Sequence, residues 1–177
     1  MAKLKRARCW RELERPYTRI SRYKKKNFIK GAPVCIIAKF EDGNLKPEET
    51  KVKVHMVVDR NIQIRQNAIE AIRQQLAKIL PEELGVQNYR YIVRAYPHHI
   101  LRENKLAGTN KAERLQTGMQ LAFGTPVGRA YQAHKGDILF TVNLSNEKLV
   151  DKVKSIFESL KSKLPCSIEI IVEKVAN

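Results

Sequence analysis

The stretch KVKVHMVVDRNIQIRQNAIEAIRQQLAKIL, residues 51–80, decides the fold class, because a strand pattern is followed in it by a helix pattern. In its first part Val52, Val54 and Met56 alternate with polar side chains. Alternation with a period of two is typical of a strand that is buried on one face only. We therefore predict a half-buried strand over 51–58, with His55 on its polar face, towards solvent or a binding partner.

The rest of the stretch predicts a long helix. From Ile62 to Leu80 the apolar residues recur at helical spacing. Asp59 or Asn61 can serve as the N-cap. We expect the helix to stop at Pro81, because proline lacks the amide hydrogen that a helix interior needs.

Further elements follow outward from this stretch. Additional strands are expected at 34–40, 89–96, 119–123, 128–133, 137–144 and 167–175. A second helix is expected after Ser145 or Asn146, with an apolar stripe up to Leu164. Strands outnumber helices, so we predict an α+β fold in which two helices pack on a mixed β-sheet.

Positive charge is concentrated in two segments. The chain has 34 Lys and Arg against 18 Asp and Glu, a formal net charge of +16. Residues 1–30 contain 12 Lys and Arg against 2 Glu, and residues 90–135 contain 8 against 2, whereas residues 31–89 and 136–177 are neutral. Charge that served solubility alone would be spread over the whole surface. The segregation therefore predicts two regions that contact a polyanion, and nucleic acid is the expected one.

The first segment is interpreted as a basic RNA-binding N-terminal arm, residues 1–30, ahead of a single α+β domain, residues 31–177. A disordered basic tail or a localisation signal is the alternative. Four aromatic residues are interleaved with the arginines, as in a segment that stacks on bases and bridges phosphates: Trp10, Tyr17, Tyr23 and Phe28. We expect residues 31–177 to fold without the arm but to enter their complex poorly.

The second segment begins with a strand and continues into a long loop. Arg90 and Arg94 fall on one face of the strand over 89–96, which favours phosphate contact over a merely solvent-facing pair. No sustained period follows, so a long basic loop is expected at about 101–117. The adjacent His98 and His99 would point to different sides, and we interpret them as groups at a strand end that touch RNA or the core.

Neither catalysis nor a cofactor is predicted. Phosphate-loop, nucleophile-elbow and zinc-protease motifs are missing, and the three cysteines, Cys9, Cys35 and Cys166, are too far apart for a zinc motif. We interpret Cys35 and Cys166 as small buried hydrophobes. The sequence contains no apolar run long enough to span a bilayer and no signal peptide at its start. A cytoplasmic protein without a metal or membrane partner is expected.

Two motifs carry a resemblance to a known family. Residues 111–119, KAERLQTGM, and residues 122–128, AFGTPVG, closely resemble the signature of a universal ribosomal protein of the large subunit. The family is called L-ten-e in archaea and eukaryotes and L-sixteen in bacteria. The match extends to ARCW at 7–10, PYTR at 16–19, KGAP at 30–33, PHHILR at 97–102 and GDILF at 136–140. The length and the long arm resemble the archaeal form.

The resemblance implies an α/β-hammerhead fold packed into large-subunit ribosomal RNA beside the aminoacyl-tRNA site. It implies that the long loop points towards the peptidyl-transferase centre, that the protein helps to position incoming tRNA, and that it joins the subunit late in assembly. The loop residues implied to contact tRNA or the peptidyl-transferase centre are Arg102, Lys105, Lys111, Arg114, Gln116 and Thr117.

The arm and the other basic positions are expected to contact the large ribosomal RNA, with 5S ribosomal RNA and neighbouring ribosomal proteins as further partners. The expected ribosomal-RNA contacts are Arg6, Arg8, Trp10, Arg11, Arg15, Tyr17, Arg19, Arg22, Lys24, Lys25, Lys26, Arg90, Arg94, His98, Arg129 and Lys135.

Two other functions would also need basic segments around a folded core. An RNA-modifying enzyme, or its RNA-binding subunit, would differ by a catalytic constellation and a cofactor loop. A DNA-binding module would present a helix that is basic on one face, and no such helix stands out.

Overall fold

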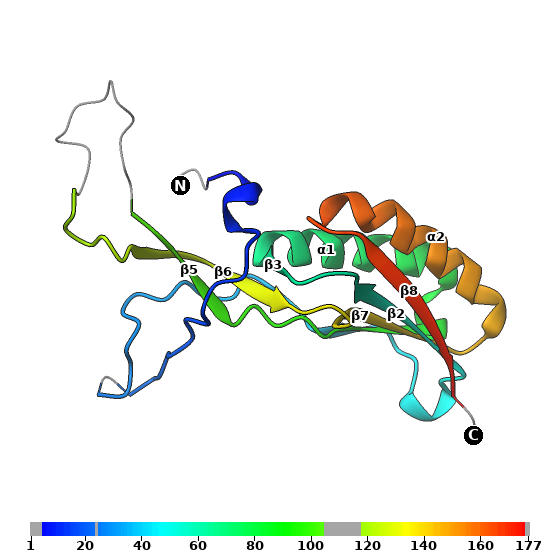
Figure 1. Ribbon diagram of the computed structural model, residues 1–177. Coiled ribbons are helices and arrows are strands. Elements are labelled where there is room, and N and C mark those ends of the chain that lie inside the picture. The colour runs from blue at the N-terminus through cyan, green and yellow to red at the C-terminus, as the bar shows by residue number, and fades with distance from the viewer. Residues whose placement is uncertain (1–4, 24, 105–117, 176–177) are drawn as a thin grey trace.

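The computed structural model describes residues 5–23, 25–104 and 118–175 (Figure 1). The strands are β1 (Glu41–Asp42), β2 (Val52–Val58), β3 (Ile62–Arg65), β4 (Tyr89–Val93), β5 (His99–Glu103), β6 (Thr125–Ala133), β7 (Ile138–Leu144) and β8 (Ile168–Lys174). The helices are α1 (Gln66–Leu84) and α2 (Val150–Leu160), with short 3-10 turns η1 (Ala7–Trp10), η2 (Pro47–Glu49), η3 (Val86–Asn88), η5 (Glu147–Leu149) and η6 (Lys161–Lys163). This is the predicted α+β composition with two helices.

A five-stranded sheet in the order β1-β4-β7-β2-β8 forms the body of the protein. Within the described ranges every ladder of this sheet is antiparallel, so the expectation of a mixed sheet is wrong. The reason lies in the strand order. Helix α2 connects β7 to β8, which run in the same direction, but β2 lies between them and pairs with both.

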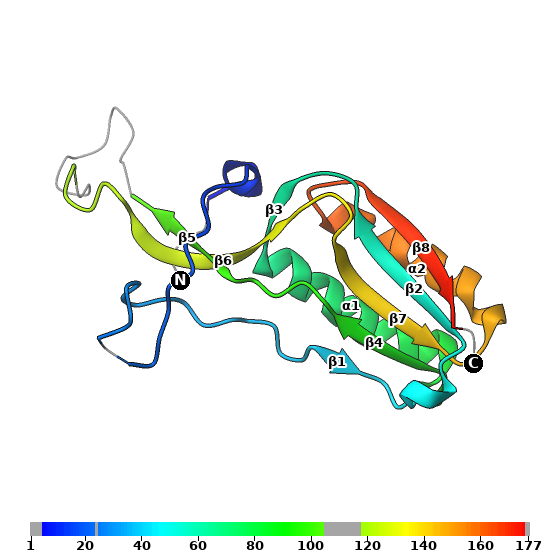
Figure 2. The ribbon, with the colours of Figure 1, turned by 60° about the horizontal axis from the view of Figure 1, so that its bottom comes forward.

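Both helices cover one face of this sheet, and no helix of the described residues lies on the opposite face (Figure 2). The alternation seen in the sequence explains the packing: Val52, Val54 and Met56 of β2 are buried in the core that the helices close. The helices contribute Ile69, Ile72, Leu76 and Leu80 from α1 and Val153, Ile156, Phe157 and Leu160 from α2. Burying each such side chain stabilises the fold by about 1.5–3 kcal/mol.

A second sheet, in the order β3-β6-β5, extends away from the helices (Figure 1). Strand β6 is long enough to pair with β3 through its end at Ala133 and with β5 through its beginning at Thr125. The N-terminal arm, drawn in blue, crosses this sheet in both views. None of the described helices is long and apolar enough to cross a membrane.

The expected helix over 62–80 is wrong at both ends. Ile62 and Ile64 form β3 and pair with β6, so the helix begins only at Gln66, and neither Asp59 nor Asn61 caps it. At the other end Pro81 lies inside the last turn. The helix continues to Leu84 and ends at Gly85, whose φ of 76° and N–H bond to the Pro81 carbonyl close it.

Two expected strands do not form. Residues 34–40 are an extended segment without a strand partner among the described residues, in which Val34 is 81% exposed, and the two-residue β1 follows it. Residues 119–123 form turns instead of a strand. There Leu121 has a φ of 61° and accepts a hydrogen bond from the Gly124 amide, which folds the chain back before β6. The strands at 51–58, 89–96, 128–133, 137–144 and 167–175 are confirmed, with shifted ends.

The second helix is confirmed, but a 3-10 turn that was not expected precedes it. Asn146 accepts a hydrogen bond from the Lys148 amide, and the turn η5 precedes α2. Cys166 is buried, as expected, whereas Cys35 is only half-buried.

The expectation for His55 is also wrong. The residue lies on the helix-free face of the sheet, but it is only 5% exposed. Its Nδ1 is 3.0 Å from the Thr141 hydroxyl, and its Nε2 is 3.3 Å from the Glu173 carboxylate. Neighbouring strands therefore enclose the ring, and it does not face solvent.

Candidate nucleic-acid interface

The arm is bound to the three-stranded sheet through its backbone. The backbone amide of Gln63 in β3 donates to the Arg11 carbonyl at 2.9 Å, and its side chain donates to the Trp10 carbonyl at 3.0 Å. The side chain of Gln132 in β6 donates to the Glu14 carbonyl at 2.8 Å and to the Gln63 side chain at 3.2 Å. Both glutamines are buried, so the arm satisfies amide groups that would otherwise lack partners.

The arm next contacts β5 at Tyr17. The Tyr17 carbonyl accepts from the Ile100 amide at 2.9 Å, and the Tyr17 amide donates to Nδ1 of His99 at 3.0 Å. His99 is fully buried, so of the two histidines it is the one that belongs to the core. Its burial lowers the pKa of the imidazole, an effect that the nearby Glu14 carboxylate opposes. A neutral ring can accept at Nδ1, so the low pKa supports this contact.

Two aromatic residues of the arm pack on the protein itself. Trp10 is 6% exposed and packs with Leu101 and Ala130, so its expected stacking on RNA is corrected to a packing role. Tyr17 is half-buried and makes an edge-to-face contact with Phe123, with ring centroids 5.3 Å apart. These two rings therefore hold the arm in place, whereas Tyr23 and Phe28 are exposed.

The cationic side chains of the arm, unlike Trp10 and Tyr17, are exposed to solvent. With the backbone fixed, the following residues are all exposed: Arg6, Arg8, Arg11, Arg15, Arg19, Arg22, Lys25 and Lys26. None of these residues makes a salt bridge to a described carboxylate. Glu14 lies instead 3.2 Å from Arg102, and Lys5 lies 3.5 Å from Glu103. Lys24 lies outside the described residues.

Arg102 sits where the arm meets the start of the predicted loop. Its guanidinium lies 4.0 Å from the Phe123 ring centroid and 4.9 Å from that of Tyr17, besides its contact with Glu14. These contacts join the arm to β5. The other predicted loop residues, Lys105, Lys111, Arg114, Gln116 and Thr117, lie outside the described residues.

The helix-free face of the large sheet carries a second basic patch. Lys53, Arg90 and Arg94 line a pocket of about 310 Å³ together with Asn143. Arg90 forms an ion pair with Glu41 of β1, whereas Arg94 is exposed and has no described acidic partner. Of the two predicted arginines, only Arg94 is therefore left with an uncompensated charge.

Three further predicted residues lie near the junction of the two sheets. Arg129 donates to the Pro33 carbonyl at 2.6 Å and to the Tyr96 hydroxyl at 3.3 Å, so its guanidinium holds the segment that follows the arm. His98 is partly exposed and lies edge-on to Tyr131 at 5.7 Å. Lys135 is exposed in the turn between β6 and β7, where its backbone amide donates to Asn61.

Several residues that shape this interface have no signal in the charge pattern. Gln63 and Gln132 hold the arm, but the sequence does not distinguish them from other polar residues, because their burial is known only from the structure. Lys53 belongs to the second patch, but it lies in a segment that is neutral by count. Among the described residues no group of three His, Cys, Asp or Glu side chains is arranged to hold a metal ion.

Fold and site together define a basic α+β protein that presents fixed, unpaired cations along one docked segment. The family model described as ribosomal protein L16p/L10e matches residues 17–171. Proteins named large ribosomal subunit protein uL16 are similar over most of their length. The one from Nanoarchaeum equitans is 42% identical over 93% of this chain and 90% of its own. The one from Thermofilum pendens is 42% identical over 97% and 98%, and that from Caldivirga maquilingensis 39% over 97% of both chains.

The chain belongs to the ribosomal protein L16p/L10e family, and its relatives are archaeal, as the sequence resemblance implied. It is therefore a protein of the large ribosomal subunit, a cytoplasmic particle in which ribosomal RNA and other ribosomal proteins are its neighbours. The family is not enzymatic.

Proposed function

We propose that this protein binds large-subunit ribosomal RNA through its docked arm, residues 1–30. The proposal rests on one observation: the backbone of the arm binds the body of the protein, whereas its basic side chains are exposed to solvent. Its backbone bonds to Gln63, Gln132 and Ile100, while its arginines are exposed and unpaired among the described residues. A fixed backbone orders these cations before binding, so less conformational entropy is lost when phosphates are contacted.

The loop predicted at about 101–117 is proposed to help position aminoacyl-site tRNA near the peptidyl-transferase centre and to support late subunit assembly; its predicted start is corrected, because residues 101–103 belong to β5. Support comes from the family signature at 111–119 and from the basic residues of the loop. The loop follows β5, whose Arg102 the arm contacts through Glu14 and Tyr17. The arm is thus placed to fix the base of the loop. We also assign the body to the α/β-hammerhead type, with residues 1–30 as its basic extension and 31–177 as its single domain.

Sucrose-gradient fractionation tests the role of the arm. A variant with Arg15→Gln, Arg19→Gln and Arg22→Gln is expected to leave the large-subunit fraction at high salt, while the wild-type protein stays bound. The matched control replaces three exposed lysines outside the arm, Lys78, Lys148 and Lys161, by Gln and is expected to stay bound. Equal retention of the arm variant and the control would refute RNA binding by the arm.

A separate variant tests the loop. Arg114→Ala is expected to slow tRNA accommodation, or to accumulate unfinished large subunits, more than it changes the free energy of unfolding. Normal translation rates together with normal subunit profiles would refute the proposed role of the loop without affecting that of the arm.

The remaining expected contacts are assigned by exposure. We propose Arg94, His98 and Lys135 as ribosomal-RNA contacts on the body, with 5S ribosomal RNA as a further candidate partner. Arg90 and Arg129 are given a smaller part, because their guanidinium groups already bind Glu41 and the Pro33 carbonyl.

A further inference from the structure

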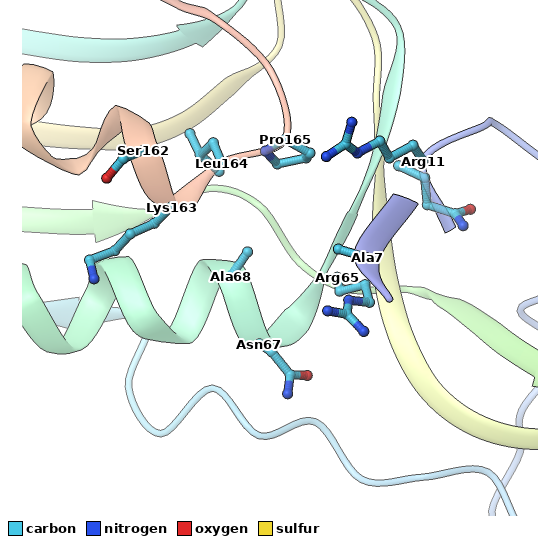
Figure 3. A pocket seen from close by; sticks show the side chains of 10 residues that line it. Ala7, Arg11, Arg65, Asn67, Ala68, Ser162, Lys163, Leu164 and Pro165 are labelled. Carbon is cyan, nitrogen blue, oxygen red and sulfur yellow. The ribbon is translucent and has the colours of Figure 1, made fainter. Parts of the chain in front are cut away.

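A cationic pocket forms where the arm meets the body. Its volume is about 330 Å³, and it lies between the turn η1, the first turn of α1 and the turn η6 with Pro165 (Figure 3). Three segments that are far apart in the sequence thus close one space. The pocket is roughly ten times larger than the ~30 Å³ that a water molecule occupies in the liquid, so it has room for a hydrated anion.

The side chains around the pocket are suited to an anion. Arg11, Arg65 and Lys163 line it, and no Asp or Glu is among its lining residues in the described part of the chain. In Figure 3 the Arg11 side chain extends towards Pro165 and Arg65 lies beside the beginning of α1, whereas the Lys163 side chain extends away from both arginines. The two guanidinium groups have no carboxylate beside them among the lining residues, so they are available to an anion.

Two of the walls are fixed by hydrogen bonds. Arg65 donates to the Lys5 carbonyl at 3.1 Å, which holds the arm beside α1. Arg60 donates to the Pro165 carbonyl at 3.0 Å, which holds the opposite wall. The pocket is therefore a preformed feature of the docked arm and does not depend on a flexible surface lysine alone.

The start of α1 adds polar donors to the same space. Asn67 and Ala68 line the pocket from the first turn of the helix. In the described chain Arg65 stands at the N-cap and makes no capping hydrogen bond, and the first turn contains no acidic residue. Amide hydrogens and a positive helix end add to the attraction that the two guanidinium groups already exert on an anion.

We propose that this pocket binds a phosphodiester phosphate of ribosomal RNA. The inference rests on the proposed RNA-binding function and deepens it, because it places one RNA contact at the junction of arm and body. RNA bound here would contact η1, α1 and η6 together. It would therefore hold the arm in its docked position.

Two single substitutions test the proposal. Arg11→Gln removes a charge that lines the pocket and extends towards Pro165, whereas Lys161→Gln removes an exposed charge that does not line it. Binding of the full-length proteins to transcribed large-subunit ribosomal RNA is measured over a range of salt concentrations. Arg11→Gln is expected to weaken binding five- to tenfold and to lower the salt slope by about 1, since each phosphate contact contributes roughly 0.7–0.9. Lys161→Gln is expected to change the affinity less than twofold.

Amide spectra provide a second readout. Ribosomal RNA fragments that bind the wild-type protein should shift the NMR signals of Asn67 and Ala68, and Arg11→Gln should reduce these shifts. Equal effects of the two substitutions, or unchanged amide signals, would overturn the phosphate site. If Arg11→Gln impaired entry into large subunits but not binding to free RNA, the pocket would instead bind an acidic protein segment, which also overturns the proposal. The same titration also includes the wild-type protein. If the wild-type protein showed no salt-dependent RNA binding, both the proposed function and the phosphate site would be overturned.

Discussion

The N-terminal arm and the segment 136–177 both contain many basic residues, but they use them differently. In the segment 136–177 six basic residues are matched by six acidic ones, and contacts such as Lys174 with Glu147 at 3.1 Å join them. In the arm 12 basic residues face 2 glutamates, and the described arginines are exposed without an acidic partner. The difference teaches that net charge marks an interface only where the protein itself leaves the charge uncompensated.

The helix α1 shows the same contrast within the body. Arg73 binds both oxygens of Glu70 at 2.8 Å, and this pairing lowers the pKa of the glutamate. An arginine held in this way has few donors left for a phosphate. The arm reverses the arrangement, because its inward contacts come from the backbone and from Trp10, which leaves its guanidinium groups outside.

Deleting the arm should have the largest effect. Without residues 1–30, the sheet loses the packing of Trp10 and Ile29 and the partners of Gln63, Gln132 and His99. We expect residues 31–177 to fold, with a free energy of unfolding lower by about 4 kcal/mol, since loss of a buried tryptophan side chain alone costs 3–5 kcal/mol. Urea unfolding measures the change. An unchanged midpoint would show that arm and body are independent, contrary to the contacts described above.

Acid should weaken the docking of the arm through His99. Burial holds the pKa of His99 below its ordinary value of 6.5, so the unfolded chain binds more protons than the folded one as the pH falls through that value. Stability is therefore present above about pH 6.5 and is lost below it, by at most about 1.4 kcal/mol per pH unit. His99→Asn, whose side-chain oxygen can accept from the Tyr17 amide, should remove this dependence between pH 7 and 5. His98→Asn is the control, and an identical pH profile for all three proteins would contradict the assignment.

The smallest effect should separate the two arginines of β4. Arg94→Gln is expected to weaken ribosomal-RNA binding two- to fivefold, because its charge is uncompensated. Arg90→Gln should change it less, and should lower stability by roughly 0.2–1 kcal/mol through the loss of a partly exposed ion pair. Filter binding and urea unfolding of the two variants check this. A larger loss of RNA affinity for Arg90→Gln would mean that Glu41 does not neutralise it.

Periodicity predicted the elements that are stabilised locally. The strand at 51–58, the strand at 89–96 and the apolar stripe of α2 were predictable because each pattern reports which residues face the core. The boundary between β3 and α1 was not. Ile62 fits both a helical and an alternating pattern, and only its pairing with Ala133 decides between them. Such long-range pairing leaves no local signal, and the same holds for residues 34–40, which lack a strand partner.

The candidate interface was predictable in its position but not in its construction. Counting charges identified the arm and its arginines. That Trp10 would be buried and that Gln63 and Gln132 would hold the arm depends on contacts more than 50 residues apart in sequence. The pairing of Arg90 with Glu41, which lies 49 residues away in the sequence, likewise separates Arg90 from Arg94. Counting charges in the sequence predicts the sign of a surface. Which of its charges form ion pairs can be determined only from the folded structure.

The salt dependence of RNA binding tests the central claim most directly. Three proteins are compared: the wild-type protein, the arm variant with Arg15→Gln, Arg19→Gln and Arg22→Gln, and the control with Lys78→Gln, Lys148→Gln and Lys161→Gln. The two variants each lose three positive charges. Their affinities for transcribed large-subunit ribosomal RNA are measured between 50 and 200 mM salt. The arm variant should lose about 2–3 from the slope of log affinity against log salt, at roughly 0.7–0.9 per phosphate, while the control keeps the wild-type slope. Equal slopes for the arm variant and the control would contradict the conclusion that the uncompensated arginines of the arm contact the RNA.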